Sequence, residues 1–445
     1  MQCNTGNALL AVFIALLSIL QLRVHFYGNG EAPQYIAIVD AGSSGSRLLV
    51  YSRRAGQLKQ HCIYAIEPGL GFFVHALDDA AHSVLNLTRE AEGCILGVDA
   101  SAHSIPLYLF ATGGLRSMLE EERDALLQSV YARVQQESGL FHVVGDVSGV
   151  LTGDMESHFG WLAVNHLSNA SRVQHLLIKG DEQVDGAGNE EGGNERIEQA
   201  SVSQKGKTDT SQTEQTVGSL DLGGASLEIA FLSNESTLVT RSFSSLGADQ
   251  LRRRLLQQLK KEHRNSHPCY PAGFEESYEG HHVVGTGDYE ACSALVEKVL
   301  ADRDACSGDF CDFQTLRIPQ MNMTFFGMSL LFYASDYCAF VRSALFDEGP
   351  ASADGLVFES DVYSQCWRRI APVPMQVLEE RIGSSHKYTG KALLPYRVLQ
   401  GVWIDAILGR IADAASTTAN RVVLVKNVGN TNVDWSLGAA LYYSG

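Results

Sequence analysis

Two short segments of the chain combine a carboxylate with a glycine-rich turn. Asp40–Arg47 reads Asp-Ala-Gly-Ser-Ser-Gly-Ser-Arg, and Asp221–Ser226 reads Asp-Leu-Gly-Gly-Ala-Ser. A glycine turn at a strand end lets backbone N–H groups approach phosphate oxygens, because no Cβ intervenes. Asp40 and Asp221 could hold Mg²⁺ or Ca²⁺, directly or through water, since hard cations prefer oxygen ligands. One such turn is usually only a hairpin turn, whereas two of the same design predict a shared phosphate site.

Hydrolysis of a phosphate also needs a group that activates water, and the segment 150–165 offers candidates. Glu156 follows a glycine turn and precedes an apolar helical pattern, so its side chain could lie at a helix start and face the site. The alternative role is capping of the helix N-terminus, which the spacing alone favours. Asp154 and His158 are further candidate bases on the same evidence.

Apolar strands flank both loops. The run 35–40 predicts a strand that ends in Asp40, and 47–51 is typical of the returning strand of a hairpin. The same arrangement recurs around Asp221. This short internal repeat predicts two related lobes, each presenting a carboxylate and a glycine loop to a shared cleft. Further strands are expected around 107–111 and 141–144, and helices over 120–136, 248–261 and 289–300.

The bulk composition bounds the class of protein. The chain has 445 residues, 45% hydrophobic and 19% charged, which suits two or three domain-sized units. Its net charge of −17 argues against nucleic acid as a partner, because phosphate backbones are bound by basic faces. An anionic substrate in an acidic protein requires a metal or a shaped loop. Residues 179–216 contain almost no large apolar side chain, so we expect a disordered insertion loop there.

The N-terminal region indicates entry into the secretory pathway. Residues 8–20 form an uncharged apolar run, so 1–32 is either an uncleaved signal-anchor or a cleaved signal peptide. Eight of the nine cysteines follow this run, and an even number in a secretory chain predicts disulfides. We expect a lumenal or extracellular domain, either secreted or held in the Golgi or endoplasmic reticulum membrane as a single-pass type II protein. Sequons compatible with a glycoprotein occur at Asn86, Asn169, Asn234 and Asn322.

Five motifs in order give the chain a resemblance to a known family. They are Asp40–Arg47, Ala111–Arg116, Leu151–Trp161, Asp221–Ser226 and Asp434–Gly438. With them the chain resembles the apyrase, or nucleoside di- and triphosphate phosphohydrolase, family over about 35–445. The resemblance implies an α/β fold of two lobes, actin/Hsp70-like (RNase H-like), with the active site in the inter-lobe cleft. We expect 33–149 plus about 415–445 to form lobe I and 150–414 to form lobe II.

The resemblance also implies roles for individual residues. Glu156 would be the general base rather than a helix cap, and Ser226 would help position the attacking water. Asp40 and Asp221 would organise Mg²⁺ or Ca²⁺ through its waters, and water would attack the terminal phosphorus without a covalent phospho-enzyme. Trp161 and Trp435 are expected to pack around the site. Phosphate contacts are expected from Ser43, Ser44, Gly45, Ser46, Arg47, Thr112, Gly223, Gly224 and Ala225.

Several positions depart from the family pattern. Glu228 stands where Gln is usual, and an ionised Glu only accepts hydrogen bonds, so it could assist activation of water or repel the phosphate. We therefore count Glu228 among the candidate catalytic residues. A serine followed by this glutamate also resembles exopolyphosphatases, which share the fold. Gly113 stands where Ala is common, and Met155 replaces one of two paired acids.

The cysteines depart from the family at one position. A late Tyr-Cys pair appears here as Tyr396-Arg397, so Cys366 lacks its usual partner and is expected to pair with Cys338. The resemblance implies three further disulfides, Cys62–Cys94, Cys269–Cys292 and Cys306–Cys311.

The expected substrate is a nucleoside diphosphate, a triphosphate or both. The Gly45 and Arg47 version of the first loop resembles lumenal nucleoside diphosphatases and soluble-type apyrases. Tyr333, Tyr396 and Trp403 are candidates for stacking on the base, although aromatic residues in a helical region are more often core. The alternatives are an exopolyphosphatase-like or kinase-like ATPase of the same fold, or a catalytically weak nucleotide-binding glycoprotein. The membrane is a further partner if the N-terminal segment is uncleaved, and the sequence predicts no oligomeric state.

Overall fold

The computed structural model describes residues 34–54, 57–95, 105–168, 216–233, 237–301, 322–350, 352–412, 420–428 and 431–444. The expected N-terminal segment, the insertion expected at 179–216 apart from Thr216, and the Cys306–Cys311 pair lie outside these residues. Among the helices that are described, none is both long and apolar enough to cross a membrane.

A six-stranded sheet carries the first glycine loop. Strands β1 to β3 form an antiparallel meander, and β4 lies parallel to β1 on its other side. Asp40 is the penultimate residue of β1, and in the antiparallel register it lies opposite Arg47 of β2. The strands, in sheet order, are β3 (Gln57–Ile66), β2 (Ser46–Arg54), β1 (Gln34–Ala41), β4 (Ile105–Ala111) and β5 (Phe141–Val143), with β6 (Gly149–Val150) also paired to β4.

Alternating side chains of β1 bury both faces of this sheet. Ala37 and Val39 pack on the face covered by helices α2 (Leu77–Ile95) and α4 (Glu120–Glu137). Ile36 and Ile38 pack on the opposite face, against α5 (Gly153–Ser168) and α13 (Trp435–Tyr443). Because successive side chains of a strand point to opposite faces, this near-continuous apolar run is what a sheet covered on both sides requires.

A five-stranded sheet repeats the arrangement around the second glycine loop. Strands β7 to β9 form an antiparallel meander, with β13 parallel to β7, and Asp221 lies opposite Glu228 in the register. The internal repeat predicted from the two loops therefore extends to a whole meander and its parallel neighbour. In sheet order the strands are β14 (Arg421–Leu424), β13 (Thr324–Ser329), β7 (Gly218–Leu222), β8 (Leu227–Leu232) and β9 (Leu238–Phe243).

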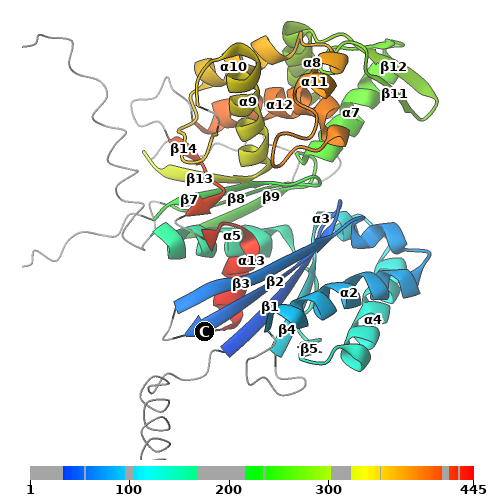
Figure 1. Ribbon diagram of the computed structural model, residues 1–445, viewed down its shortest axis with the longest axis vertical. Helices are drawn as coiled ribbons and strands as arrows, with labels where there is room; N and C mark the ends of the chain where they lie inside the picture. The colour runs from blue at the N-terminus through cyan, green and yellow to red at the C-terminus, as the bar shows by residue number, and fades with distance from the viewer. Residues whose placement is uncertain are drawn as a thin grey trace, which may run out of the picture.

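The two sheets and their helices form a layered, two-lobed molecule (Figure 1). Helices α5 and α13 lie between the sheets, and the later helices cover the outer face of the five-stranded sheet. These are α7 (Ala248–Lys261), α8 (Tyr289–Ala301), α9 (Leu330–Phe346), α10 (Ser360–Ile370), α11 (Met375–Arg381) and α12 (Arg397–Ile411). Smaller elements are α3 (Gly113–Arg116), η1 (Leu70–Phe73), η3 (Lys391–Tyr396), β10 (Ser266–His267), β11 (Glu275–Tyr278), β12 (His281–Gly285), β15 (Asn427–Val428) and β16 (Thr431–Asn432).

The C-terminal segment is divided between the two lobes. We expected about 415–445 to belong to lobe I, but β14 pairs with β13 in the five-stranded sheet. Val422 and Leu424 of β14 complete the apolar core beneath the later helices, which accounts for this placement. Helix α13, in contrast, packs against α5, β1 and β2. The remaining bounds of the lobes stay a prediction.

A glycine allows α13 to approach α5 closely. A Cβ built on Gly438 would lie 1.8 Å from the carbonyl oxygen of Phe159 in α5. The helix begins at Asp434, whose side chain caps it by accepting a hydrogen bond of 2.9 Å from the Ser436 N–H. The fifth motif therefore serves as a helix start and a helix–helix contact.

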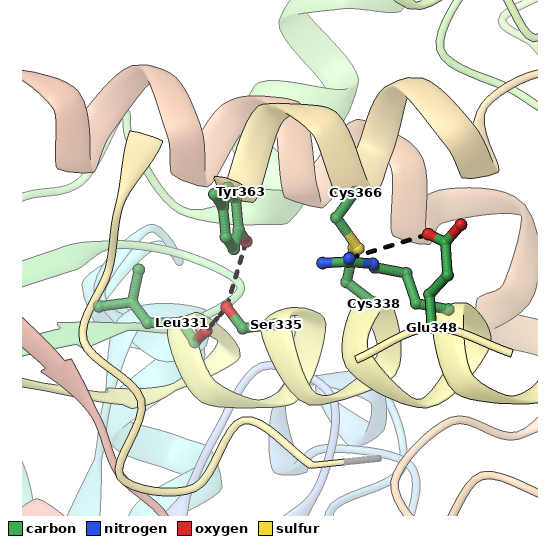
Figure 2. The surroundings of a disulfide bond; sticks show 7 residues. Leu331, Ser335, Cys338, Glu348, Tyr363 and Cys366 are labelled. Atoms are coloured by element: carbon green, nitrogen blue, oxygen red, sulfur yellow. Dashed lines mark hydrogen bonds and ion pairs between the residues drawn. A yellow bond between two sulfur atoms is a disulfide. The ribbon is translucent and has the colours of Figure 1, made fainter. Parts of the chain in front are cut away.

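Three of the four predicted disulfides lie in the described part of the chain, and all three are confirmed. They are Cys62–Cys94, Cys269–Cys292 and Cys338–Cys366. Figure 2 shows the last of these, which joins α9 to α10. Beside it, Ser335 hydrogen-bonds to the Leu331 carbonyl at 2.5 Å and to the Tyr363 hydroxyl at 3.2 Å, so a covalent and a polar contact hold the two helices together.

Candidate active site

A cavity of about 490 Å³ brings the two glycine loops together. Its lining includes the whole first loop from Gly42 to Arg47 and the second from Leu222 to Ser226. Every predicted catalytic, phosphate-binding and metal-binding residue lines this one cavity. These are Asp40, Ser43, Ser44, Gly45, Ser46, Arg47, Thr112, Glu156, Asp221, Gly223, Gly224, Ala225, Ser226 and Glu228.

The two loops have the same backbone turn, and the second lies against the start of α3. In the first, Gly42 N–H donates to the Gly45 carbonyl at 2.9 Å, and in the second Gly223 N–H donates to the Ser226 carbonyl at 2.9 Å. A Cβ on Gly113, at the start of α3, would lie 2.3 Å from the Ala225 Cβ. The glycine that departs from the family pattern thus leaves room for the second loop.

Arg47 pairs with the candidate metal-binding carboxylate of the first loop. Its Nη2 lies 2.5 Å from Asp40 Oδ2, and its Nη1 lies 3.9 Å from Asp434 Oδ2. Burial raises the pKa of Asp40, and the Arg47 charge opposes that rise. The guanidinium expected to contact phosphate therefore also neutralises the carboxylate beside it.

Arg116 links the second motif to the candidate base. Its guanidinium forms an ion pair with Glu156, and its Nε donates to the Leu151 carbonyl at 2.7 Å. Its Nη1 lies 3.6 Å from Glu228 Oε1 and donates to Ser226 Oγ at 3.4 Å. Arg116 lies in the second motif, but the sequence predicted no role for its side chain, because its partners come from separate segments.

Glu156 is the candidate base that lines the cavity. It is 9% exposed, whereas Asp154 is exposed and His158 packs against the rings of Phe159 and Tyr442. Burial raises the pKa of Glu156 well above its usual value, and the charge of Glu228 adds to this rise, while Arg116 opposes it. A carboxylate with a raised pKa is a stronger base towards water.

Two further carboxylates of the cavity hold their protons more tightly than usual. Burial raises the pKa of Asp221 to about 6. Burial, and then the charge of Asp221, raises the pKa of Glu228 to about 7. Glu228 accepts a hydrogen bond of 3.0 Å from the Ser242 hydroxyl, which fixes the orientation of its carboxyl group.

The charges around the cavity fit a divalent cation. Six carboxylates line it, against two arginines, Arg47 and Arg397. In the described part of the chain no three acidic, histidine or cysteine side chains lie close enough together to hold a metal directly. Carboxylate oxygens are the ligands that Mg²⁺ and Ca²⁺ prefer, and binding through water by Asp40 and Asp221 stays a prediction. The six carboxylates are Asp40, Glu67, Glu156, Asp221, Glu228 and Asp249.

Two tyrosines line another part of the cavity. Tyr333 of α9 was a predicted base-stacking residue, and its ring centroid lies 5.2 Å from that of Tyr388. The Lys426 Nζ lies 4.9 Å from the Tyr333 ring and 5.0 Å from the Tyr388 ring. Tyr388 was not predicted from the sequence, because it lies outside the five motifs and outside any helix, where no spacing pattern indicates a role.

The other two base-stacking candidates lie elsewhere. Trp403 is fully buried in the helical core, and its Nε1–H donates to the Leu246 carbonyl at 2.9 Å. A ring with no exposed face cannot stack on a ligand, so this prediction was wrong. Tyr396 packs against the rings of Tyr270 and Phe274 at 5.7 and 5.8 Å, away from the cavity lining. Trp435 lines the cavity as a packing residue.

Two segments of the chain, 28–239 and 232–445, match the family model described as the GDA1/CD39 (nucleoside phosphatase) family. The chain belongs to this family. It is thus a nucleotide phosphohydrolase, as the apyrase resemblance predicts, and enzymes of the GDA1/CD39 family depend on divalent cations in general.

Individual relatives of the GDA1/CD39 chain agree with this placement. The nucleoside-diphosphatase mig-23 of Caenorhabditis briggsae is 24% identical over 466 residues, covering 92% of this chain and 76% of the relative. Ectonucleoside triphosphate diphosphohydrolase 2 of Gallus gallus is 22% identical over 491 residues, covering 98% and 88%.

Solved structures share the fold. A nucleoside triphosphate hydrolase structure from Neospora caninum superposes with a TM-score of 0.61 at 15% identity, covering 99% of this chain and 96% of the other. A Ppx/GppA family member from Aquifex aeolicus superposes with a TM-score of 0.50 at 14% identity, covering 93% and 98%. At these identities the likeness concerns the fold alone, and it confirms the predicted two-lobe α/β class.

Proposed function

We propose that this chain hydrolyses the terminal phosphate of nucleoside diphosphates, triphosphates or both, using Mg²⁺ or Ca²⁺ and water activated by a base. One observation carries the proposal: two glycine loops with matching turns line a single cavity together with a buried glutamate. Neither loop alone would distinguish a phosphate site from a hairpin turn.

The loops supply the phosphate contacts. Backbone N–H groups of both turns and the hydroxyls of Ser43 and Ser44 would donate hydrogen bonds to the phosphate oxygens. Asp40 and Asp221 would hold the cation through its waters, and the bound cation would neutralise charge on the reacting phosphate. Arg47, already paired with Asp40, would offset part of the cost of ionising that buried carboxylate.

Glu156 would take a proton from the attacking water. The ion pair with Arg116 orients the Glu156 carboxyl group. Ser226, whose hydroxyl accepts a hydrogen bond from the same arginine, would hold the water in line with the terminal phosphorus. Glu228 would accept a hydrogen bond from the same water, since Ser242 and Arg116 fix its position. Attack by water needs no nucleophilic side chain, so no covalent intermediate is proposed.

Tyr333 and Tyr388 would contact the nucleobase. Both line the cavity that contains the phosphate loops, and their rings lie close enough to form one aromatic surface. Aromatic faces bind any base by stacking, so this surface is compatible with several nucleotides.

A second candidate function is hydrolysis of inorganic polyphosphate. Glu228 in the cavity and the fold shared with the Aquifex aeolicus Ppx/GppA protein support it. The two tyrosines favour the nucleotide, because polyphosphate has no ring to stack on them.

Phosphate release from ATP, ADP, UDP, GDP and polyphosphate, each with Mg²⁺, Ca²⁺ or a chelator, tests the proposal. We expect release from nucleotides that requires a cation and no acceptor. Activity unaffected by chelator would contradict the metal-dependent mechanism. Loss of phosphate from the nucleotide only when a phosphate acceptor is present would indicate a kinase-like enzyme. Release from polyphosphate alone would favour the second candidate. Nucleotide binding without release would indicate a catalytically weak glycoprotein.

We also infer a place in the secretory pathway. The three disulfides support an oxidising compartment, since such bonds are rare in the cytosol. The sequons at Asn86 and Asn322 lie on exposed side chains, compatible with glycosylation. Retention by the N-terminal segment in the Golgi or endoplasmic reticulum membrane remains the prediction. Sensitivity of the expressed protein to an endoglycosidase tests entry into that pathway.

A further inference from the structure

Arg397 is a buried arginine on the wall of the nucleotide cavity. It is the first residue of α12, it is 2% exposed, and it lines the cavity together with Tyr388 and Gln400. The family resembled by this chain usually has a cysteine at the position of Arg397, and here Cys366 pairs with Cys338 instead (Figure 2).

The guanidinium of Arg397 has neutral partners. Its Nε donates to Thr389 Oγ1 at 3.0 Å, its Nη1 to Gln400 Oε1 at 2.8 Å and its Nη2 to the Tyr388 carbonyl at 3.0 Å. It forms no ion pair with a carboxylate in the described part of the chain. Burial lowers its pKa to about 10, so the group stays charged at neutral pH. Three of its five N–H donors are engaged there, and no partner in the described part of the chain is recorded for the other two.

Gln400 adds a donor to the same wall. Its Oε1 accepts from Arg397, so its amide nitrogen still has two N–H donors, and the residue lines the cavity. Arg397 is bonded to the backbone of Tyr388, one of the two tyrosines proposed to stack on the base. A base stacked there would turn one edge towards these donors.

A wall of donors favours a base whose edge consists of acceptors. Guanine presents two adjacent acceptors, O6 and N7, which match the guanidinium fork. Adenine presents the N6 amino donor beside N7, so one donor would face another. Uracil offers the single acceptor O4 on the corresponding edge.

We propose that Arg397, supported by Gln400, is a specificity-determining residue that reads the O6/N7 edge of guanine, so that guanosine diphosphate is preferred over adenosine diphosphate. This inference rests on the proposed nucleotide hydrolysis and adds the base to it. Arg397 acts on the base and not on the reacting phosphate, so it affects KM more than kcat.

Kinetics of the wild-type protein with base analogues tests the inference without any variant. The substrates are the diphosphates of guanosine, inosine, 7-deazaguanosine and adenosine, with the same cation. Inosine diphosphate keeps O6 and N7, so we expect its KM to equal that of guanosine diphosphate. We expect the KM for 7-deazaguanosine and adenosine diphosphates to be about 5- to 100-fold higher, the range of one bidentate contact. Equal KM values for all four would overturn the inference.

Substitutions at position 397 supply the second arm. Arg397→Gln should raise KM for guanosine diphosphate about 5- to 100-fold, with KM for adenosine diphosphate changed less than about 2-fold and kcat retained. Arg397→Lys keeps the charge and can still donate to O6 and N7, so it should retain part of the guanine preference that Arg397→Gln loses. A guanine preference that is unchanged in Arg397→Gln would overturn the inference. Arg410→Gln, on the exposed end of α12 where Arg410 pairs with Glu297, is the matched control and should change neither KM.

The remaining outcomes separate structural from recognition roles. An equal rise of KM for both nucleotides would overturn the inference and indicate that Arg397 only supports the segment at Thr389. If the variants fail to fold, judged by their melting temperature, the wild-type analogue series still decides. If the wild-type protein hydrolyses no nucleotide, the proposed function fails, and calorimetric binding of guanosine and adenosine diphosphates tests the base preference on its own.

Discussion

At the scale of residues, one arginine connects the groups on which hydrolysis would depend. Arg116 contacts Glu156, Glu228 and Ser226, which come from three separate elements or turns. Burial raises the pKa of Glu156 and of Glu228, neighbouring carboxylates add to the rise, and the single charge of Arg116 opposes it only in part. The site therefore contains basic carboxylates that are costly to ionise without a cation.

Replacement of the candidate base tests its role directly. Glu156→Gln keeps the shape and the contact with Arg116 but cannot accept a proton. We expect kcat to fall by about 10²–10⁴-fold, the usual contribution of a general base, with KM changed less than about 3-fold. Asp154→Asn, on the same helix but exposed, is the control and should leave kcat unchanged. A Glu156→Gln enzyme as fast as wild type would remove Glu156 from the mechanism.

The pKa of Glu228 leads to a prediction about stability. In the unfolded chain this carboxyl group loses its proton near pH 4.3, whereas in the folded protein it keeps it up to about pH 7. Between these pH values the folded state binds more protons than the unfolded state, so the contribution of Glu228 to the free energy of unfolding decreases as pH rises. Glu228→Gln has no ionisable group at this position, so it should not show this decrease.

With chelator present, we expect Glu228→Gln and wild type to melt at similar temperatures at pH 4. At pH 8 the variant should be more stable by roughly 1–3 kcal/mol. A variant less stable than wild type at pH 8 would show that Arg116 and Ser242 stabilise the ionised carboxylate after all. Melting temperatures measured in steps of pH decide between these outcomes.

At the scale of elements, the contact between α5 and α13 joins the lobes beneath the cavity. Helix α5 carries Glu156 and also packs on the strands of the five-stranded sheet, while α13 packs on β1 and β2. The close contact between α13 and α5 at Gly438 therefore fixes the position of the six-stranded sheet relative to the five-stranded sheet.

Gly438→Ala should destabilise the protein, because the added Cβ would overlap the Phe159 backbone, which cannot rotate away. We expect a loss of about 1–3 kcal/mol, the usual cost of overpacking. Gly409→Ala in α12 is the matched control, since a Cβ there meets nothing within 4 Å, and it should stabilise by up to about 1 kcal/mol. Thermal unfolding of both variants measures the difference, and equal effects would contradict the packing argument.

At the scale of the whole molecule, ligands that bind between the lobes should stabilise the fold by linkage. A non-hydrolysable nucleotide with Mg²⁺, at 100 times its dissociation constant, should add about 2.7 kcal/mol to the free energy of unfolding. We expect a rise in melting temperature that requires nucleotide and cation together. In the double variant Asp40→Asn with Asp221→Asn, adding the cation should no longer increase the rise in melting temperature. A rise in melting temperature that is the same with chelator as with Mg²⁺ would contradict a cation at this site.

Much of the site could be predicted from short segments. The roles of the glycine loops and of Asp40, Asp221 and Glu156 can be predicted from short motifs, because a turn and its phosphate donors occupy neighbouring positions in the sequence. The same holds for the repeated hairpin, whose apolar strands flank each loop, whereas the third strand of each meander was not predicted. Tyr388 and the contacts of Arg116 could not be predicted, since both depend on residues far away in the chain. Trp403 was misassigned because an aromatic residue on a helix can face either core or cavity.

The sequence by itself therefore determined the chemistry of the loops, the α/β class and three disulfide pairings that the structure describes. Those features follow from residue types at short spacing and from the resemblance that such motifs carry. Only the tertiary structure decided which groups face one another. It brought Glu228 to Arg116, assigned β14 to the second sheet, and placed Arg397 beside Tyr388, because these contacts arise where separate elements pack and no local pattern encodes that packing.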